Sequence, residues 1–256
     1  MNTGRHRIGF LILSLPRTGS TSLTRLLNCH QRVHCLIEPF HPKRYGGRFY
    51  TLAREASLEA ALRLISIRWN GMKHVWEASG WPFIDRPALN EELVIGSKRV
   101  IYLVRRNLLR RFVSNYICRH TEYWIGVREE FYARLKQIQL GPLDPALLHA
   151  QIRRDRDAVE QRLSFIENQG IHVKCLYYED FYRAGASSQE RLDVVNSLFA
   201  FLQFEPITLE YFIRNCEQHF SAAINQWASP EVYRRIPAIE QIENEVGSDE
   251  TGWLFR

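Results

Sequence analysis

Cysteine is scarce in this chain of 256 residues, and the few cysteines present are poorly arranged for cross-links or metal sites. The five are scattered, odd in number and without any C-x-x-C pair: Cys29, Cys35, Cys118, Cys175 and Cys216. This pattern predicts neither a disulfide framework nor a zinc site. It favours reduced, mostly buried thiols in a cytoplasmic protein.

Long apolar runs are also missing. No segment approaches the roughly 20 apolar residues that a membrane helix needs. Arg5, His6 and Arg7 precede an apolar stretch, as in a signal peptide, but Arg17 interrupts that short stretch and no small-x-small cleavage site follows. We therefore expect a cytoplasmic protein without stable membrane insertion.

The chain lacks a basic run of the kind found in nucleic-acid-binding tails, and it has no low-complexity tract or internal repeat. Its formal net charge of +6 favours anionic partners, although an excess of this size often serves solubility alone. Because basic residues gather after one strand and not along a face, nucleic acid is the least favoured partner. With 45% hydrophobic residues the chain can bury one substantial core, so residues 1–256 are expected to form one domain.

Strand-like and helix-like segments alternate along the chain. Short apolar runs predict strands at 8–14, 33–37, 71–76, 99–104 and 172–177. Apolar residues at helical spacing predict helices at 20–28, 57–68, 107–119, 145–169 and 189–203, the third capped by Asn107 and the fourth ended by Gly170. This alternation predicts a three-layer α/β fold with a central parallel sheet flanked by helices. Ligands of such folds bind at the carboxyl ends of the strands.

Residues 15–23 read L-P-R-T-G-S-T-S-L and connect the first predicted strand to the first predicted helix. Backbone amides at a helix N-terminus, with the helix dipole behind them, form a ready site for an anion. Gly19 lets the backbone turn close to a ligand, and four hydroxyls add donors: Thr18, Ser20, Thr21 and Ser22. The alternative is an ordinary strand–helix turn with a capping serine or threonine.

This P-loop-like segment lacks the lysine of the Walker A pattern G-x-x-x-x-G-K-[ST], because no lysine follows Gly19. The cation that reaches a terminal nucleotide phosphate in that pattern is missing from this position. A kinase or an ATPase is therefore disfavoured.

A second polar segment follows the predicted strand at 99–104, R-V-I-Y-L-V. Arg106 stands at the strand end, and Ser114 lies eight residues further on, about two turns into the predicted helix. Arginine offers a bidentate fork for a phosphate, and a serine two turns away can donate to the same anion. Taken alone, the arginines of this segment also fit a solvated basic helix start: Arg105, Arg106, Arg110 and Arg111.

Together the P-R-T-G-S-T loop and the later strand-Arg-Asn-x6-Ser segment resemble the sulfotransferase superfamily that uses 3′-phosphoadenosine 5′-phosphosulfate (PAPS). In that family the loop holds the 5′-phosphosulfate, and the arginine and serine, here Arg106 and Ser114, hold the 3′-phosphate. L-Y-Y-E-D-F at 176–181 is similar to a third family segment, whose tyrosine, here Tyr178, lies near the adenine. The resemblance spans about residues 8–204, and the P-R-T-G and V-R-R-N-L segments are most similar to short bacterial carbohydrate enzymes of the nodulation-factor type.

The resemblance also implies catalytic roles. Arg17 meets the sulfuryl group, where charge grows on the bridging oxygen as the bond breaks. Cytosolic relatives carry a histidine two residues after a strand lysine, but after Lys73 that position is Val75, and strand alternation puts His74 on the other face. Glu38, 21 residues after Arg17, is the expected general base, because nodulation-type and tyrosyl-protein sulfotransferases carry a glutamate at this interval.

Within a partly closed site the Glu38 carboxylate can have a raised pKa and accept the acceptor's proton. Lys73, by its position in the family, helps to hold the sulfuryl group. The alternative for Glu38 is a structural role, either pairing with an arginine or capping the turn before Pro39.

The acceptor is expected to be a small molecule or glycan with a free hydroxyl, bound by subregions at about 41–90 and 121–145. These subregions contain rings able to stack on sugars, although aromatic side chains are more often core: Phe49, Trp69, Trp76, Trp81, Phe83, Tyr123 and Trp124. No metal is expected, because sulfate carries less charge than phosphate and no acidic ligand cluster stands out. A kinase-like nucleotide phosphotransferase and a non-catalytic nucleotide-binding protein remain alternatives, and the sequence leaves the oligomeric state open.

Overall fold

The computed structural model describes residues 8–124, 128–220 and 230–256 of the chain. The basic start at 5–7 and residues 125–127 of the expected acceptor subregion lie outside the described residues. The described part has the predicted α/β fold, with a parallel sheet in the order β2-β3-β1-β4-β5. Its strands are β1 (Phe10–Ser14), β2 (Cys35–Ile37), β3 (Gly71–Val75), β4 (Arg99–Val104) and β5 (His172–Tyr177).

The strand order reverses beside β1, which pairs with β3 on one side and with β4 on the other. After β1 the chain runs outward to β2, returns to β3, and then crosses β1 to reach β4 and β5. The loops that leave β1 and β4 therefore diverge to opposite sides of the sheet. In parallel α/β sheets this divergence opens a crevice at the carboxyl ends of the two strands.

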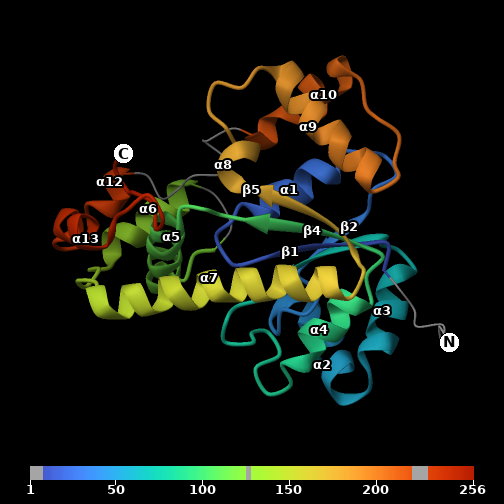
Figure 1. Ribbon diagram of the computed structural model, residues 1–256, viewed down its shortest axis with the longest axis horizontal. Helices are drawn as coiled ribbons and strands as arrows, with labels where there is room; N and C mark the ends of the chain where they lie inside the picture. Colours follow the sequence, from blue (N-terminus) through green and yellow to red (C-terminus); the bar gives the residue numbers. More distant parts are fainter. Residues whose placement is uncertain (1–7, 125–127, 221–229) are drawn as a thin grey trace.

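Helices cover both faces of the sheet (Figure 1). One face of β1, with Phe10 and Ile12, packs against α1 (Ser20–Leu27), α9 (Ser188–Phe201) and α10 (Leu209–Asn215). The other face, with Leu11 and Leu13, packs against α2 (Arg48–Glu55), α3 (Leu58–Ser66), α4 (Ala88–Ile95) and the C-terminal half of α7 (Pro145–Asn168). A strand buried on both faces needs a continuous apolar run, which explains F-L-I-L in β1.

A separate apolar cluster lies at the carboxyl ends of the strands, to the left in Figure 1. It joins α5 (Leu108–Thr121), α6 (Arg128–Gln137), the start of α7, α12 (Pro230–Tyr233) and α13 (Ile239–Val246). Asn107 caps α5 as predicted, because its side chain accepts the Arg110 amide at 2.8 Å. The predicted stop of α7 is also present, since Gly170 has φ +64°. This cluster closes the end of the sheet at which the site residues lie.

The remaining described elements are short: η1 (Arg44–Gly47), α8 (Tyr178–Phe181) and η2 (Glu217–Phe220). All five cysteines are free thiols, and three of them are buried. Within the described ranges, no helix combines the length and the apolar character needed to cross a bilayer.

Candidate active site

The loop 15–19 leaves the carboxyl end of β1, where the strand order reverses, and leads directly into α1, which begins at Ser20. The first N–H groups of a helix have no acceptor within the helix, so those at the start of α1 point toward the carboxyl end of the sheet. With the helix dipole they give this edge a partial positive charge. The backbone by itself therefore offers a site for an anion.

Gly19 is the one residue of the loop that no other residue type can replace without strain. Its φ is +81°, in the left-handed region that favours glycine. A Cβ added here would lie 2.8 Å from a ring carbon of Tyr182 and 2.9 Å from one of Tyr178. Since the Tyr182 hydroxyl also donates to the Gly19 carbonyl at 2.9 Å, the two rings fix the turn from outside. The absence of a side chain at Gly19 thus makes room for two tyrosine rings, and the close approach of a ligand to this backbone stays a prediction.

The predicted hydroxyls have different partners. Ser14 donates to Ser20 at 2.9 Å, which leaves the Ser20 proton available to another acceptor. Thr18 is 1% exposed and donates at 3.0 Å to the Leu15 carbonyl, so it supports the turn itself. The Ser22 side chain is in hydrogen-bond contact with the Tyr182 hydroxyl. Among Thr18, Ser20 and Ser22, Ser20 is thus the one best placed to donate to an anion.

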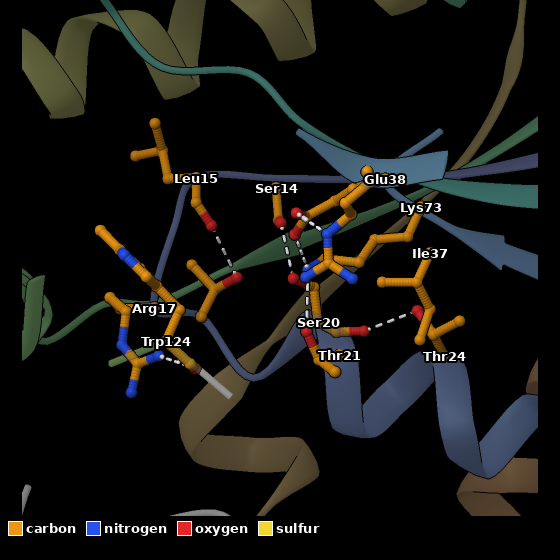
Figure 2. A network of polar contacts seen from close by, with 12 residues as sticks. Ser14, Leu15, Arg17, Ser20, Thr21, Thr24, Ile37, Glu38, Lys73 and Trp124 are labelled. Carbon is orange, nitrogen blue, oxygen red and sulfur yellow. Dashed lines mark hydrogen bonds and ion pairs between the residues drawn. The ribbon is translucent and has the colours of Figure 1, made fainter. Parts of the chain in front are cut away.

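Glu38 and Lys73 form an ion pair beside the loop, as Figure 2 shows. Glu38 directly follows β2, and Lys73 lies in β3, paired in register with Ile37 of β2. The Lys73 ammonium also donates to the Thr21 hydroxyl at 2.9 Å, and the second carboxylate oxygen of Glu38 pairs with Arg44 at 3.2 Å. The lysine side chain is 4% exposed and the glutamate side chain 12%. Three predicted site residues are therefore in direct contact.

The charges around Glu38 overturn the expectation of a raised pKa. Burial raises the pKa of this carboxyl, but the Lys73 ammonium and the Arg44 guanidinium outweigh burial, and the net shift is downward. Burial also lowers the pKa of Lys73, against the opposing effect of Glu38. Glu38 is therefore an ionised carboxylate at neutral pH, able to accept a proton but held as a weak base while both cations face it.

Arg17 joins the loop to α5. Its Nε donates to the Ser114 hydroxyl at 3.0 Å, and its Nη1 lies 3.4 Å from the Trp124 carbonyl oxygen. The residue has φ +65°, which is uncommon for a side chain other than glycine or asparagine. Ser114, 4% exposed, thus lies at the loop and has Arg17 as its partner, whereas the sequence predicts Arg106 and Ser114 together at one phosphate.

Two arginines that the sequence analysis gave no site role hold the backbone of the loop. Arg105 donates to the Arg17 carbonyl at 3.0 Å, and Arg111 lies 3.4 Å from the Pro16 carbonyl oxygen. Arg111 also forms a buried ion pair with Asp155 of α7. In the sequence these residues stand in two adjacent pairs, 105–106 and 110–111. The sequence does not show which arginine of each pair faces the loop.

Arg106 lies on the outer side of the β4–α5 connection. Its side chain is 52% exposed, pairs with Asp180 at 2.7 Å and lies over the Tyr177 ring at 3.8 Å. Glu179 accepts its backbone amide at 3.0 Å. Arg106 and Ser114 are thus held by different partners, and Arg106 must leave Asp180 before both can bind one phosphate. Their shared role stays a prediction.

Tyr178 lies beside the loop, at the Cβ position of Gly19, and its place near an adenine stays a prediction. Its ring contacts Tyr182, with centroids 4.9 Å apart, and the Arg105 guanidinium lies 4.4 Å from its centroid. The Tyr178 ring thus lies between Arg105, which holds the Arg17 carbonyl, and Gly19 of the turn.

His74 faces away from this site, which confirms the alternation predicted for β3. Its Nε2 lies 2.8 Å from the Asn90 side-chain oxygen, and its ring packs near Phe40 and Phe83 in the core. Burial lowers its pKa to about 4, so this histidine is neutral at pH 7. His74 therefore contributes no side chain to this site.

The aromatic residues of the expected acceptor subregions divide into core and site. Phe49, Phe83 and Tyr123 are buried core residues, whereas Trp124 is 41% exposed and adjoins Arg17 through its carbonyl. Trp81 contacts His41, with ring centroids 5.2 Å apart, and the His41 amide donates to the Glu38 carbonyl. Trp69 and Trp76 are partly buried against the core.

The C-terminal segment packs across the start of α5. Asn107 donates to the Trp253 carbonyl at 2.7 Å, and Arg110 donates to those of Leu254 and Arg256 at 2.9 Å and 2.8 Å. This segment therefore helps to fix the connection that carries Arg105 and Arg106.

No family model matches the chain, and no curated protein matches it. The function must be inferred from the fold and from the residues of the site.

Proposed function

We propose that the protein transfers the sulfuryl group of PAPS to a hydroxyl of a carbohydrate or glycolipid acceptor. The observation that carries the proposal is the contact between Lys73, Glu38 and Thr21. This contact supports the proposal, because a carboxylate able to take a proton and a cation able to stabilise a leaving oxygen lie together beside the first turn of α1.

The loop and α1 fit the 5′ end of such a nucleotide. The amides at the N-terminus of α1 and the Ser20 hydroxyl supply donors, and Gly19 lets Tyr178 and Tyr182 pack against the turn that presents these donors. The 3′ end fits only after Arg106 exchanges Asp180 for a phosphate. This exchange is inexpensive, because an exposed ion pair contributes about 0–1 kcal/mol.

In the proposed reaction, the acceptor oxygen forms a bond to sulfur while the bond between sulfur and the bridging oxygen breaks. Glu38 accepts the proton of the acceptor hydroxyl, and Lys73 and Arg17 stabilise the negative charge that grows on the bridging oxygen. The products are a sulfate ester and adenosine 3′,5′-bisphosphate.

The Lys73–Glu38 contact couples these two tasks. While Lys73 faces Glu38, its charge helps to keep the pKa of the carboxyl low. An anion at the start of α1 attracts the ammonium, which weakens its contact with Glu38 and makes the carboxylate a stronger base. Binding of the donor therefore prepares the base.

A transfer assay tests the proposal. The purified full chain is incubated with ³⁵S-labelled PAPS and a panel of acceptors, namely oligosaccharides, glycolipids, tyrosine peptides and simple phenols. We expect label on a sugar acceptor and release of the bisphosphate. A parallel reaction with γ-labelled ATP tests the phosphotransferase alternative.

Two results contradict the proposal. Transfer of phosphate from ATP without transfer from PAPS indicates a phosphotransferase. Tight binding of the bisphosphate with no transfer to any acceptor class indicates a nucleotide-binding protein without catalysis.

A further inference from the structure

A second cluster of reactive side chains lies at the end of α1 opposite the loop. Cys29 follows the C-terminal turn of α1, Cys216 directly follows α10, and His219 lies in η2. The Cys29 thiol is within hydrogen-bond contact of both Cys216 and His219. The proposed sulfuryl transfer uses none of these three groups.

The fold holds Cys29 against α10 through contacts on both of its sides. The Cys29 sulfur donates to the Asn215 carbonyl at 3.1 Å, directly before Cys216 in the chain. The Tyr211 hydroxyl donates to the Cys29 carbonyl at 2.6 Å. Cys29 is half-buried and Cys216 is fully buried, so a reagent from solvent meets Cys29 first. Contacts of the backbone on both sides of Cys29 thus hold the two cysteines next to each other.

These contacts also give the two thiols different pKa values. The hydrogen bond from Cys216 has the largest effect and lowers the pKa of Cys29, burial opposes it, and His219 lowers the pKa further. The same hydrogen bond raises the pKa of Cys216, since its proton is shared with the neighbouring sulfur. The Cys29 sulfur also donates to the carbonyls of Arg25 and Asn215, at 3.4 Å and 3.1 Å. The thiolate is the nucleophile, so Cys29 is the group that attacks.

We propose that Cys29 and Cys216 form a thiol pair that reacts with small disulfides such as glutathione disulfide. The Cys29 thiolate attacks one sulfur of the small disulfide, forms a mixed disulfide and releases one small thiolate, which takes up a proton. Cys216 then attacks the Cys29 sulfur, loses its proton and displaces the second small thiol. One small disulfide is reduced to two thiols, and two protein thiols are oxidised to one disulfide.

The resulting bridge joins the end of α1 to the end of α10. It lies on the helical layer that α1, α9 and α10 form above the sheet in Figure 1. Cys29 follows the C-terminal end of α1, whereas Lys73 contacts Thr21 in its first turn. The proposal is therefore independent of the proposed sulfuryl transfer.

The test uses the reduced full chain and glutathione disulfide. After incubation, free thiols are alkylated and counted by mass spectrometry, and peptides are mapped. We expect the count to fall from five to three, with a Cys29–Cys216 peptide and no lasting glutathione adduct. In Cys216→Ser the reaction should stop at a glutathione adduct on Cys29.

Cys175→Ser is the matched control, because Cys175 is also half-buried but lies in β5. This variant should form the bridge at the wild-type rate. Five free thiols in the treated wild-type chain, or an equal loss of thiols in Cys29→Ser, overturns the proposal. These two arms decide the question even where Cys216→Ser, which alters the core, fails to fold.

Discussion

Two buried ion pairs lie near the loop 15–19, one with Arg111 beside the Pro16 carbonyl and one with Lys73 beside Thr21, and they differ in how completely they are closed. The Arg111 and Asp155 side chains are 3% and 4% exposed. The Lys73 and Glu38 side chains are 4% and 12% exposed, so the carboxylate of this pair keeps an open edge. A closed pair cannot change partners without leaving a charge unpaired in the interior.

The additional partners of the two carboxylates show the same difference between a closed pair and an open one. Asp155 also accepts from Gln151 at 3.0 Å, within its own helix. Glu38 instead shares its second oxygen with Arg44, whose side chain is 31% exposed. Arg44 can turn to solvent while Glu38 remains near Lys73. One pair therefore supports the loop, and the other is able to exchange partners when a ligand arrives.

The strongest test of this comparison is Glu38→Gln. The amide keeps the shape of the side chain but cannot accept the acceptor's proton, so turnover should fall about 10²–10⁴-fold. Bisphosphate binding, measured by calorimetry, should stay within a few-fold of wild type. A fall in turnover of less than tenfold, or a loss of binding that matches it, would show that Glu38 is not the base.

Asp155→Asn should break the closed pair and act on stability. Because it leaves the buried Arg111 guanidinium without its counter-charge, the free energy of unfolding should fall by about 3–5 kcal/mol. Denaturant titration measures the change. Asp180→Asn removes the partner of an exposed pair and should lower stability by about 1 kcal/mol or less. Similar losses in the two variants would contradict the distinction between closed and open pairs.

Arg106→Ala tests the exposed pair for a binding role. Losing a charge-assisted hydrogen bond to the 3′-phosphate removes about 1.5–3 kcal/mol, so bisphosphate binding should weaken at least tenfold. Binding of 5′-AMP should hardly change, and neither should the melting temperature. Equal losses for the two nucleotides would place Arg106 away from the 3′-phosphate.

The smallest expected effect is on stability in acid. The pKa of folded Glu38 lies below its ordinary value of 4.5, because its cationic partners outweigh burial. Its contribution to the free energy of unfolding is therefore complete above about pH 4.5 and is lost as the pH falls through the lower folded value. The stability difference between wild type and Glu38→Gln should shrink over that range, as measured by denaturant titration at several pH values. A difference that does not vary with pH would contradict the lowered pKa.

Much of the candidate site follows from local pattern. The apolar run of β1 and the helical spacing of α1 fix the position of the loop, and Asn107 is recognisable as a cap from its place before α5. Strand alternation alone sends Lys73 to the site and His74 to the core. Each of these features depends on a period of two or 3.6 residues, or on the chemistry of one position, which a sequence displays directly.

What the sequence by itself determined is therefore the α/β layering, the place of the loop and the face on which Lys73 lies. The tertiary structure decided which charges meet. It brought Arg44 and Lys73 onto Glu38 and so reversed the expected direction of its pKa, and it paired Arg106 with Asp180, 74 residues away. Long side chains find partners through the packing of distant elements, and the direction of a pKa shift depends on those partners. A local period in the sequence therefore predicts neither the partners nor the direction of the shift.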